Sequence, residues 1–225
     1  MKNEEKIEKT CKEGLTELVF ILDRSGSMAS LTEDTIGGYN SFLEKQKEVE
    51  GECLVSTVLF NQCSSVIHDR VDIKGISGMT RNDYVASGST ALIDALGDAI
   101  HHIKNVHRYI RKEDVPEKTI FVITTDGLEN ASRRYSSTDV KKMVEEQKQK
   151  GWEFLFLADN IDAVETAKSY GINEEMAVNY VNDSRGNRLK FETVGRAVHN
   201  MRVRGKIEPG WAEEIKADYS ERKNR

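Results

Sequence analysis

The feature that most constrains the fold is an apolar run that ends abruptly in polar residues. Residues Leu18 to Leu22 are all apolar, and Asp23, Ser25 and Ser27 follow them directly. An unbroken apolar run of this length is typical of a strand that is buried on both faces, as in a parallel sheet. The polar residues then lie at the carboxyl end of the strand, which is where open α/β sheets bind ligands.

The side chains of Asp23, Ser25 and Ser27 carry oxygen donors at alternate positions. A hard cation such as Mg²⁺ prefers a near-octahedral shell of oxygens, and this spacing can place one carboxylate and two hydroxyls on one side of the ion. An ordinary turn, with Asp23 as a helix cap, is the alternative interpretation, because Asp, Ser and Gly also dominate turns. The rest of the chain has to distinguish the two.

Two further polar positions are expected near the same edge of the sheet. An apolar run that ends at Thr125 is followed by Asp126 and Gly127, which repeats the pattern of the first strand. Thr90 stands where an N-cap would open a helix with a buried stripe. Three polar loops are therefore predicted at the carboxyl edge of the sheet or on the segment that leads into a helix there.

The remaining pattern alternates between strands and helices. Strands are predicted at 18–22, 54–60, 66–73, 118–125, 152–158 and 176–181. Helices are predicted at 30–50, 90–106, 136–149, 161–170 and 191–203, the first of them with a capping box of Ser30 and Glu33. The second and third strands are too close for a crossover helix, so we expect an antiparallel hairpin.

This order predicts an α/β fold: a doubly wound, mostly parallel, Rossmann-like sheet of about six strands with helices on both faces and one antiparallel edge strand. Two adjacent glycines, Gly37 and Gly38, interrupt the first helix. Either they weaken it, by roughly 1 kcal/mol each relative to alanine if they are exposed, or they allow close packing against the sheet. The sequence leaves both interpretations open.

Composition restricts the class of protein. The net charge of −5 gives no overall basic signal for nucleic acid, and no run is long and apolar enough for a membrane span. The first residues do not resemble a secretory signal. Three cysteines (Cys11, Cys53 and Cys63) without a C-x-x-C pair favour reduced thiols over a disulfide framework or a cysteine metal site. We therefore expect a cytoplasmic protein with no membrane partner.

The motifs D-R-S-G-S-M, G-S-T-A-L and T-T-D-G, in this order and in this context, resemble the von Willebrand factor A (VWA) domain and its metal-ion-dependent adhesion site. The resemblance covers roughly residues 16–181. The stretches 35–43 and 68–73 are similar to stand-alone bacterial members of the family. We accordingly expect a charged N-terminal arm (1–13), a VWA domain (14–182), and a C-terminal helix with a charged tail (183–225), packed on or trailing from the same domain.

The resemblance implies a complete set of metal residues in this chain. Asp23, Ser25 and Ser27 match the first motif, Thr90 matches the isolated threonine, and Asp126 matches the second aspartate. It further implies that the serine hydroxyls bind Mg²⁺ directly, whereas Thr90 and the aspartates bind directly or through water. Mn²⁺ and Ca²⁺ are the alternative ions.

The leading functional hypothesis is a metal-dependent protein-binding module. Neutral hydroxyl and water ligands leave the ion much of its positive charge, so an Asp or Glu of a partner can complete the coordination shell. The predicted helix N-termini after Ser30 and near Thr90 add a potential that favours an anion.

Two other hypotheses come from different classes of protein. A bound Mg²⁺ could serve a hydrolase or a phosphoryl-transfer enzyme, but the predicted loops contain no histidine or cysteine, and the chain lacks the G-x-x-x-x-G-K-[ST] and G-x-G-x-x-G motifs. Alternatively, an acidic partner such as nucleic acid could bind residues 183–206, which contain seven basic and two acidic residues. Such a run is more often the solvated face of a terminal helix, and we favour that interpretation.

Overall fold

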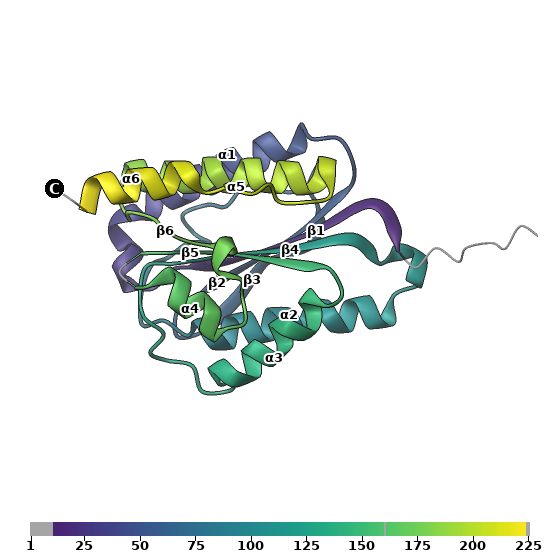
Figure 1. Ribbon diagram of the computed structural model, residues 1–225, viewed down its shortest axis with the longest axis horizontal. Coiled ribbons are helices and arrows are strands. Elements are labelled where there is room, and N and C mark those ends of the chain that lie inside the picture. Colours follow the sequence, from purple (N-terminus) through teal and green to yellow (C-terminus); the bar gives the residue numbers. More distant parts are fainter. Residues whose placement is uncertain (1–10, 160, 224–225) are drawn as a thin grey trace, which may run out of the picture.

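The computed structural model describes residues 11–159 and 161–223. Within this part of the chain it contains one six-stranded sheet with helices on both faces (Figure 1). The strands are β1 (Lys12–Asp23), β2 (Cys53–Phe60), β3 (Ser64–Asp72), β4 (Pro116–Thr125), β5 (Trp152–Ala158) and β6 (Ala177–Asn179). Their order is β3-β2-β1-β4-β5-β6, and only the β2–β3 pair is antiparallel. The predicted fold class is therefore confirmed.

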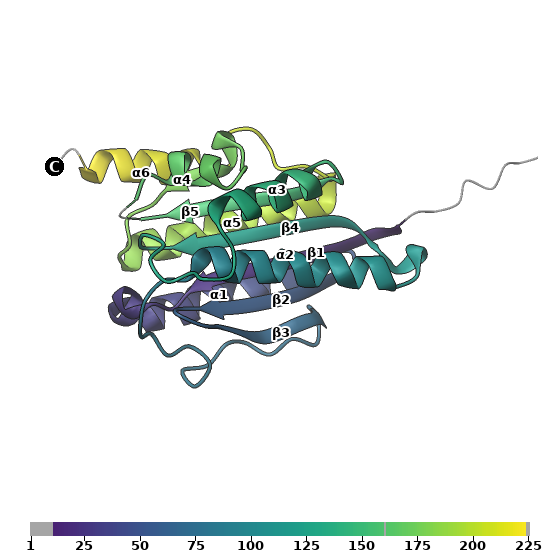
Figure 2. The same cartoon turned by 90° about the horizontal axis from the view of Figure 1, so that it is seen from below.

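The helices divide between the two faces of the sheet, as Figures 1 and 2 show. One face carries α1 (Thr32–Lys47), α5 (Ser184–Arg204) and α6 (Glu213–Lys223). The other carries α2 (Leu92–Tyr109), α3 (Ser137–Lys148) and α4 (Ala163–Ser169). Three short 3₁₀ helices join these elements: η1 (Gly26–Leu31), η2 (Lys112–Asp114) and η3 (Glu174–Met176). None of the helices in residues 11–159 and 161–223 is long and apolar enough to cross a membrane.

The continuous apolar run of β1 is explained by its central place in the sheet. Leu18 to Leu22 are fully buried, and successive side chains point to opposite faces. Leu18, Phe20 and Leu22 belong to the core beneath α1 and α5, whereas Val19 and Ile21 belong to the core beneath α2. Each such side chain contributes about 1.5–3 kcal/mol by its burial, so the strand anchors both layers.

The register between the two central strands places the predicted metal residues side by side. Leu22 of β1 pairs with Thr124 of β4 in a parallel ladder. Because both strands end within one residue of this pair, Asp23 lies beside Thr125, and Asp126 follows at the same edge. The other neighbour of β1 pairs Asp23 with Phe60, so this edge also receives the end of β2.

Two predicted helix caps are wrong. Ser30 lies inside η1, which runs directly into α1 at Thr32, and no side chain caps that helix. Thr90 does not cap α2, which begins at Leu92 with Ala91 in the cap position. Instead, the N–H of Thr90 donates to the Asn130 side chain (2.9 Å), and the N–H of Asn130 donates to the Thr90 carbonyl (3.0 Å). These bonds hold Thr90 to a neighbouring loop.

The C-terminal segment packs against the sheet through α5. α5 begins seven residues earlier than predicted, because Asp183 caps it by accepting a hydrogen bond from the N–H of Gly186. Its buried residues belong to the same core as β1, and α6 packs against α5. At the other end, β1 starts at Lys12, inside the predicted arm of residues 1–13. The rest of that arm, residues 1–10, lies outside the described residues.

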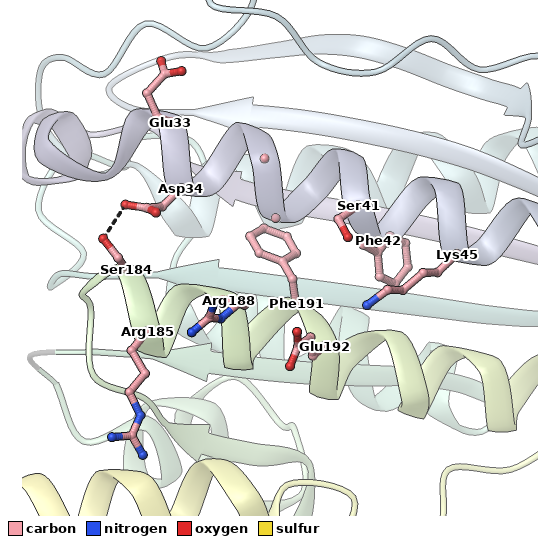
Figure 3. Close-up of a pocket in the computed structure, with 12 residues that line it drawn as sticks. Glu33, Asp34, Ser41, Phe42, Lys45, Ser184, Arg185, Arg188, Phe191 and Glu192 are labelled. Atoms are coloured by element: carbon pink, nitrogen blue, oxygen red, sulfur yellow. Dashed lines mark hydrogen bonds between the residues drawn. The ribbon is translucent and has the colours of Figure 1, made fainter.

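The two adjacent glycines of α1 have different environments. A Cβ on Gly38 would lie 2.3 Å from the Phe191 ring, whereas a Cβ on Gly37 would have no neighbour within 4 Å. Figure 3 shows the Phe191 ring of α5 directed at α1, and this ring is one of the residues that line a groove of about 510 Å³ between the two helices. Gly38 is therefore needed for close packing, although the contact is with α5 and not with the sheet.

We expect G38A to lower the free energy of unfolding by about 1–3 kcal/mol, because the added methyl group forces Phe191 to move. G37A is the matched control: it adds the same methyl group to open space and should stabilise the helix by up to about 1 kcal/mol. Urea unfolding of both variants measures the difference. Equal effects of the two substitutions would show that α1 and α5 are not packed in this way.

Candidate metal site

Three of the five predicted metal residues are joined by their own side chains. The Ser27 hydroxyl donates to Oδ1 of Asp126 at 2.7 Å, and the Ser25 hydroxyl lies 3.5 Å from the same oxygen. The two serine oxygens are 3.2 Å apart. Ser25 and Asp126 are buried, but Ser27 is exposed. The cluster thus opens to solvent on the side of Ser27.

Asp23 is held at this cluster by donors to both carboxylate oxygens. The N–H of Ser25 donates to Oδ1 at 2.7 Å, and the Thr125 hydroxyl donates to Oδ2 at 2.6 Å. The Tyr84 hydroxyl donates to the main-chain carbonyl of Asp23. These contacts fix the orientation of a carboxylate that is only 2% exposed.

Thr90 reaches the cluster through its neighbours in the chain. A Cβ on Gly127, the residue after Asp126, would lie 4.0 Å from the Thr90 hydroxyl. Two residues earlier in the same segment, the carbonyl of Gly88 accepts a hydrogen bond from the N–H of Gly26, between the two serines. The structure therefore joins Asp23, Ser25, Ser27 and Asp126 by hydrogen bonds and places Thr90 on a segment beside them, and their role as metal ligands stays a prediction.

The loop after Asp126 is fastened to the start of α2 by two acids. Asp94 accepts hydrogen bonds from three successive N–H groups, those of residues 133–135, at 2.9–3.0 Å. Glu129 accepts from the N–H of Ile93 at 2.8 Å and from the N–H groups of residues 131 and 132. Although burial opposes it, the backbone N–H donors lower the pKa of Asp94. These bonds keep Asn130 in place to hold Thr90.

Sequence reasoning missed several residues that position this cluster. Asn182 donates to Oδ2 of Asp126 at 3.2 Å and so links the segment before α5 to the site. Its position three residues after β6 was a usable signal, because it places a polar side chain at the carboxyl edge of the sheet. Asn130 and Tyr84 carried no such signal, since their contacts depend on how long irregular segments fold back.

The electrostatics of the cluster favour a cation. Burial raises the pKa of Asp126, and the negative charge of Asp23 acts in the same direction, although the Ser27 hydroxyl opposes both. Two carboxylates at adjacent strand ends repel each other unless a positive charge lies between them. A divalent ion near Asp23 and Asp126 would remove this repulsion.

The chemistry of the donors fits a hard ion. The five residues offer two carboxylates and three hydroxyls, all of them oxygen ligands of the kind that Mg²⁺ prefers. In residues 11–159 and 161–223, no three His, Cys, Asp or Glu side chains gather in a way that could hold a metal. A metal bound here would therefore depend on the hydroxyls as well as on the two acids.

Apolar side chains lie exposed on the loops that flank the cluster. Leu128, two residues after Asp126, is 68% exposed, and Val85 is 57% exposed. Val85 belongs to a segment that is bonded to the first loop through Tyr84 and Ser87. It also lines a hollow of about 410 Å³ between that segment and η1.

Six of the seven basic residues in segment 183–206 are buried or paired with acids, and the seventh, Arg188, is exposed. Lys190 and Arg202 are buried, and the guanidinium of Arg202 donates to main-chain carbonyls at the end of α1 and just beyond it. Four others form ion pairs with nearby acids: Arg185 with Asp218, Arg196 with Glu214, and both Arg204 and Lys206 with Glu208. The hypothesis of an acidic partner bound here loses most of its support.

Comparison with known proteins identifies the fold. No family model and no curated protein sequence matches the chain. The structure is similar to the PilB minor pilin of Streptococcus sanguinis, studied as a point variant (TM-score 0.60, 10% identity, 83% of this chain and 62% of that one). It is also similar to the von Willebrand factor domain of the type V pilus tip protein Mfa5 of Porphyromonas gingivalis (TM-score 0.59, 9% identity, 86% of this chain and 98% of that one).

A third similar structure contains a metal. Proximal thread matrix protein 1 of the mussel byssus, solved with zinc in its metal-ion-dependent adhesion site, has a TM-score of 0.53 and 12% identity. The match covers 83% of this chain but only 46% of that one, so this chain spans about half of the thread protein and under two thirds of the pilin. At these identities the similarity shows the fold alone: the chain has the fold of a von Willebrand factor A domain.

Proposed function

We propose that this chain is a divalent-metal-dependent protein-binding module with an intact metal-ion-dependent adhesion site. The observation that carries the proposal is the convergence of the Ser25 and Ser27 hydroxyls on Asp126, with Asp23 beside them, at the carboxyl edge of the sheet. The fold supports it, because similar domains include one whose adhesion site is described as occupied by zinc.

The residues have separate tasks in this proposal. Ser25, Ser27 and Thr90 offer neutral oxygens to the ion, and Asp23 and Asp126 balance its charge. When bound, a Mg²⁺ ion supplies a positive centre that accepts an outside carboxylate; Mn²⁺ and Ca²⁺ are the alternative ions. Ser27, the exposed member of the cluster, marks the side from which a partner's Asp or Glu approaches.

The surroundings of the cluster describe the partner more closely. Leu128 and Val85 are exposed on segments that adjoin the metal residues in the chain or are bonded to them, and exposed apolar groups beside a polar centre are typical of protein interfaces. We therefore propose a partner whose acidic residue is flanked by apolar residues. The three free cysteines support a reducing, cytoplasmic compartment for this interaction.

A metal-dependent hydrolase or phosphoryl-transfer enzyme is the second candidate. The side chains that contact the cluster are hydroxyls and amides, from Thr125, Tyr84 and Asn182 among others, and none of these is an efficient general base at neutral pH. The similar structures reported above are named as pilus and matrix proteins. Turnover of phosphate or ester substrates above a D23A background would favour the enzyme.

The first prediction concerns metal binding. Saturating Mg²⁺, at about one hundred times its Kd, should stabilise the wild-type protein by about 2.7 kcal/mol through linkage, which corresponds to a rise in Tm of roughly 5–10 °C for a domain of this size. D23A should show almost no rise. E44Q, which removes an exposed acid of α1 far along the helix, is the control and should behave as wild type. A similar rise in D23A would contradict the site.

The second prediction separates the metal from the surface around it. T90A should weaken partner capture by about tenfold to a hundredfold, as expected for 1–3 kcal/mol from a lost polar ligand. L128S should also weaken capture but leave the Mg²⁺-induced rise in Tm unchanged, because Leu128 offers no ligand.

Pull-downs with wild type, D23A, T90A and L128S, each with Mg²⁺ or EDTA, followed by mass spectrometry, measure this. A partner retained equally by D23A and in EDTA would exclude the metal face as the binding surface.

A further inference from the structure

An ammonium group is buried in the core beneath the metal cluster. Lys190 of α5 is 1% exposed, and it takes part in no ion pair among the described residues. Its Nζ lies 3.5 Å from the Tyr180 hydroxyl, 4.6 Å from the centre of the Tyr180 ring and 4.9 Å from that of Phe191. A buried charge is costly unless it is compensated, so the position of Lys190 requires an explanation.

The surroundings of Lys190 connect it to the metal residues without touching them. The Tyr180 hydroxyl, which accepts from Lys190, donates to the carbonyl of Thr125 at 3.5 Å. Thr125 is the residue before Asp126, and its own hydroxyl donates to Asp23 at 2.6 Å. The Lys190 ammonium is therefore connected by two hydrogen bonds to Thr125, which precedes Asp126 in the chain and bonds to Asp23 through its side chain.

The charge on Lys190 is balanced only in part. Burial lowers the pKa of Lys190 to about 7, although the negative charges of Asp126 and Asp23 favour the protonated form. Tyr180 does not supply a charge, because burial raises its pKa well above the ordinary value and keeps it a phenol. Close to neutral pH, Lys190 thus responds to the charge at the metal site.

Several other charged groups on the helices beside α5 have partners of their own. On α1, Asp34 accepts a hydrogen bond from Ser184. On α6, Asp218 pairs with Arg222 and Arg185, and Arg222 also pairs with Asp183. The buried phenols Tyr39 and Tyr84, whose pKa values are raised by burial, stay neutral. The carboxylates whose negative charges act on Lys190 are Asp126 and Asp23.

We propose that Lys190 is the internal counter-charge of the metal site: its ammonium compensates Asp23 and Asp126 in the metal-free protein, and a bound divalent ion displaces its proton. The inference rests on the proposed metal site and states how that site is regulated. The exchange is balanced, because the ion enters with two positive charges and Lys190 releases one proton to the solvent as it becomes a neutral amine. Metal binding and protonation of Lys190 then oppose each other.

Because metal binding and protonation of Lys190 oppose each other, the metal affinity should depend on pH. Below the pKa of Lys190, binding has to remove a proton, so the metal affinity falls as the pH falls; above it, the amine is already neutral and the affinity is full. With a pKa of about 7, roughly one molecule in ten is neutral at pH 6 and nine in ten at pH 8. The apparent Kd for the metal should thus tighten about tenfold between pH 6 and pH 8.

Titration calorimetry of the whole chain with MgCl₂ or MnCl₂ tests this at pH 6, 7 and 8, in pairs of buffers whose ionisation enthalpies differ. The buffer dependence of the heat gives the number of protons released. Wild type should release about half a proton per ion at pH 7. K190M, whose side chain is similar in length and suited to the core, should release almost none and bind about tenfold more tightly than wild type at pH 6. The two proteins should bind equally at pH 8.

The controls separate Lys190 from the carboxylates. Any proton that Asp126 releases is shared by wild type and K190M, so the difference between the two belongs to Lys190. K190R, whose charge is permanent, should bind most weakly at every pH and release no extra proton. If K190M does not fold, the proton release of the wild type still decides, because its absence at pH 7 would overturn the inference.

The outcomes distinguish the two proposals. If the wild type binds no divalent ion at any pH, the proposed metal site fails and this inference fails with it. If the wild type binds but K190M shows the same pH profile and the same proton release, the metal site stands and Lys190 is only a core residue.

Discussion

The structure depends on the pairing of β1 with β4. An acid stands just beyond the last pair of this parallel ladder on each chain segment, and the register places Asp23 and Asp126 at one edge of the sheet. Burial raises the pKa of Asp126, and the negative charge of Asp23 beside it acts in the same direction. The ladder itself is held by apolar packing on both faces. The stability of the core therefore maintains an electrostatic arrangement that the two acids alone would not adopt.

Neutral groups position these acids. Thr125, Ser25 and Ser27 donate to the carboxylates, and Asn182 reaches Asp126 from the segment before α5. Asn130 holds the main chain of Thr90 by two hydrogen bonds, one through its side chain and one through its own N–H. The loop that contains Asn130 is in turn bonded to α2. Because so many donors are hydroxyls and amides, the cluster gains fixed geometry without gaining further charge. Such an arrangement leaves a bound cation with much of its positive charge, as an acceptor of an outside carboxylate must have.

The sequence was informative where a local pattern carries the structure. The apolar run 18–22 predicted a central strand, and the acids that end two such runs predicted which residues meet. It was wrong at Ser30 and Thr90, because tertiary bonds and a preceding 3₁₀ helix replaced the predicted caps. It could not choose a role for Gly38, since the partner ring lies on α5, more than 150 residues later. The positions of Asn130 and Tyr84 depend on contacts across long loops, which no periodicity records.

Lys190 shows why composition alone misleads in the C-terminal segment. Counted in the sequence, it adds to a basic run; in the structure it faces the core and not the solvent. A methionine of similar length would pack there without the cost of desolvation, so a lysine is reasonable only if its charge has a use. In the metal-bound state the charges of two carboxylates, one divalent ion and a neutral Lys190 sum to zero. In the metal-free state the protonated Lys190 balances one of the two negative charges. Because Lys190, Asp23 and Asp126 are all buried, an exchange of one cation for another that keeps the net charge small in both states limits the cost of desolvation.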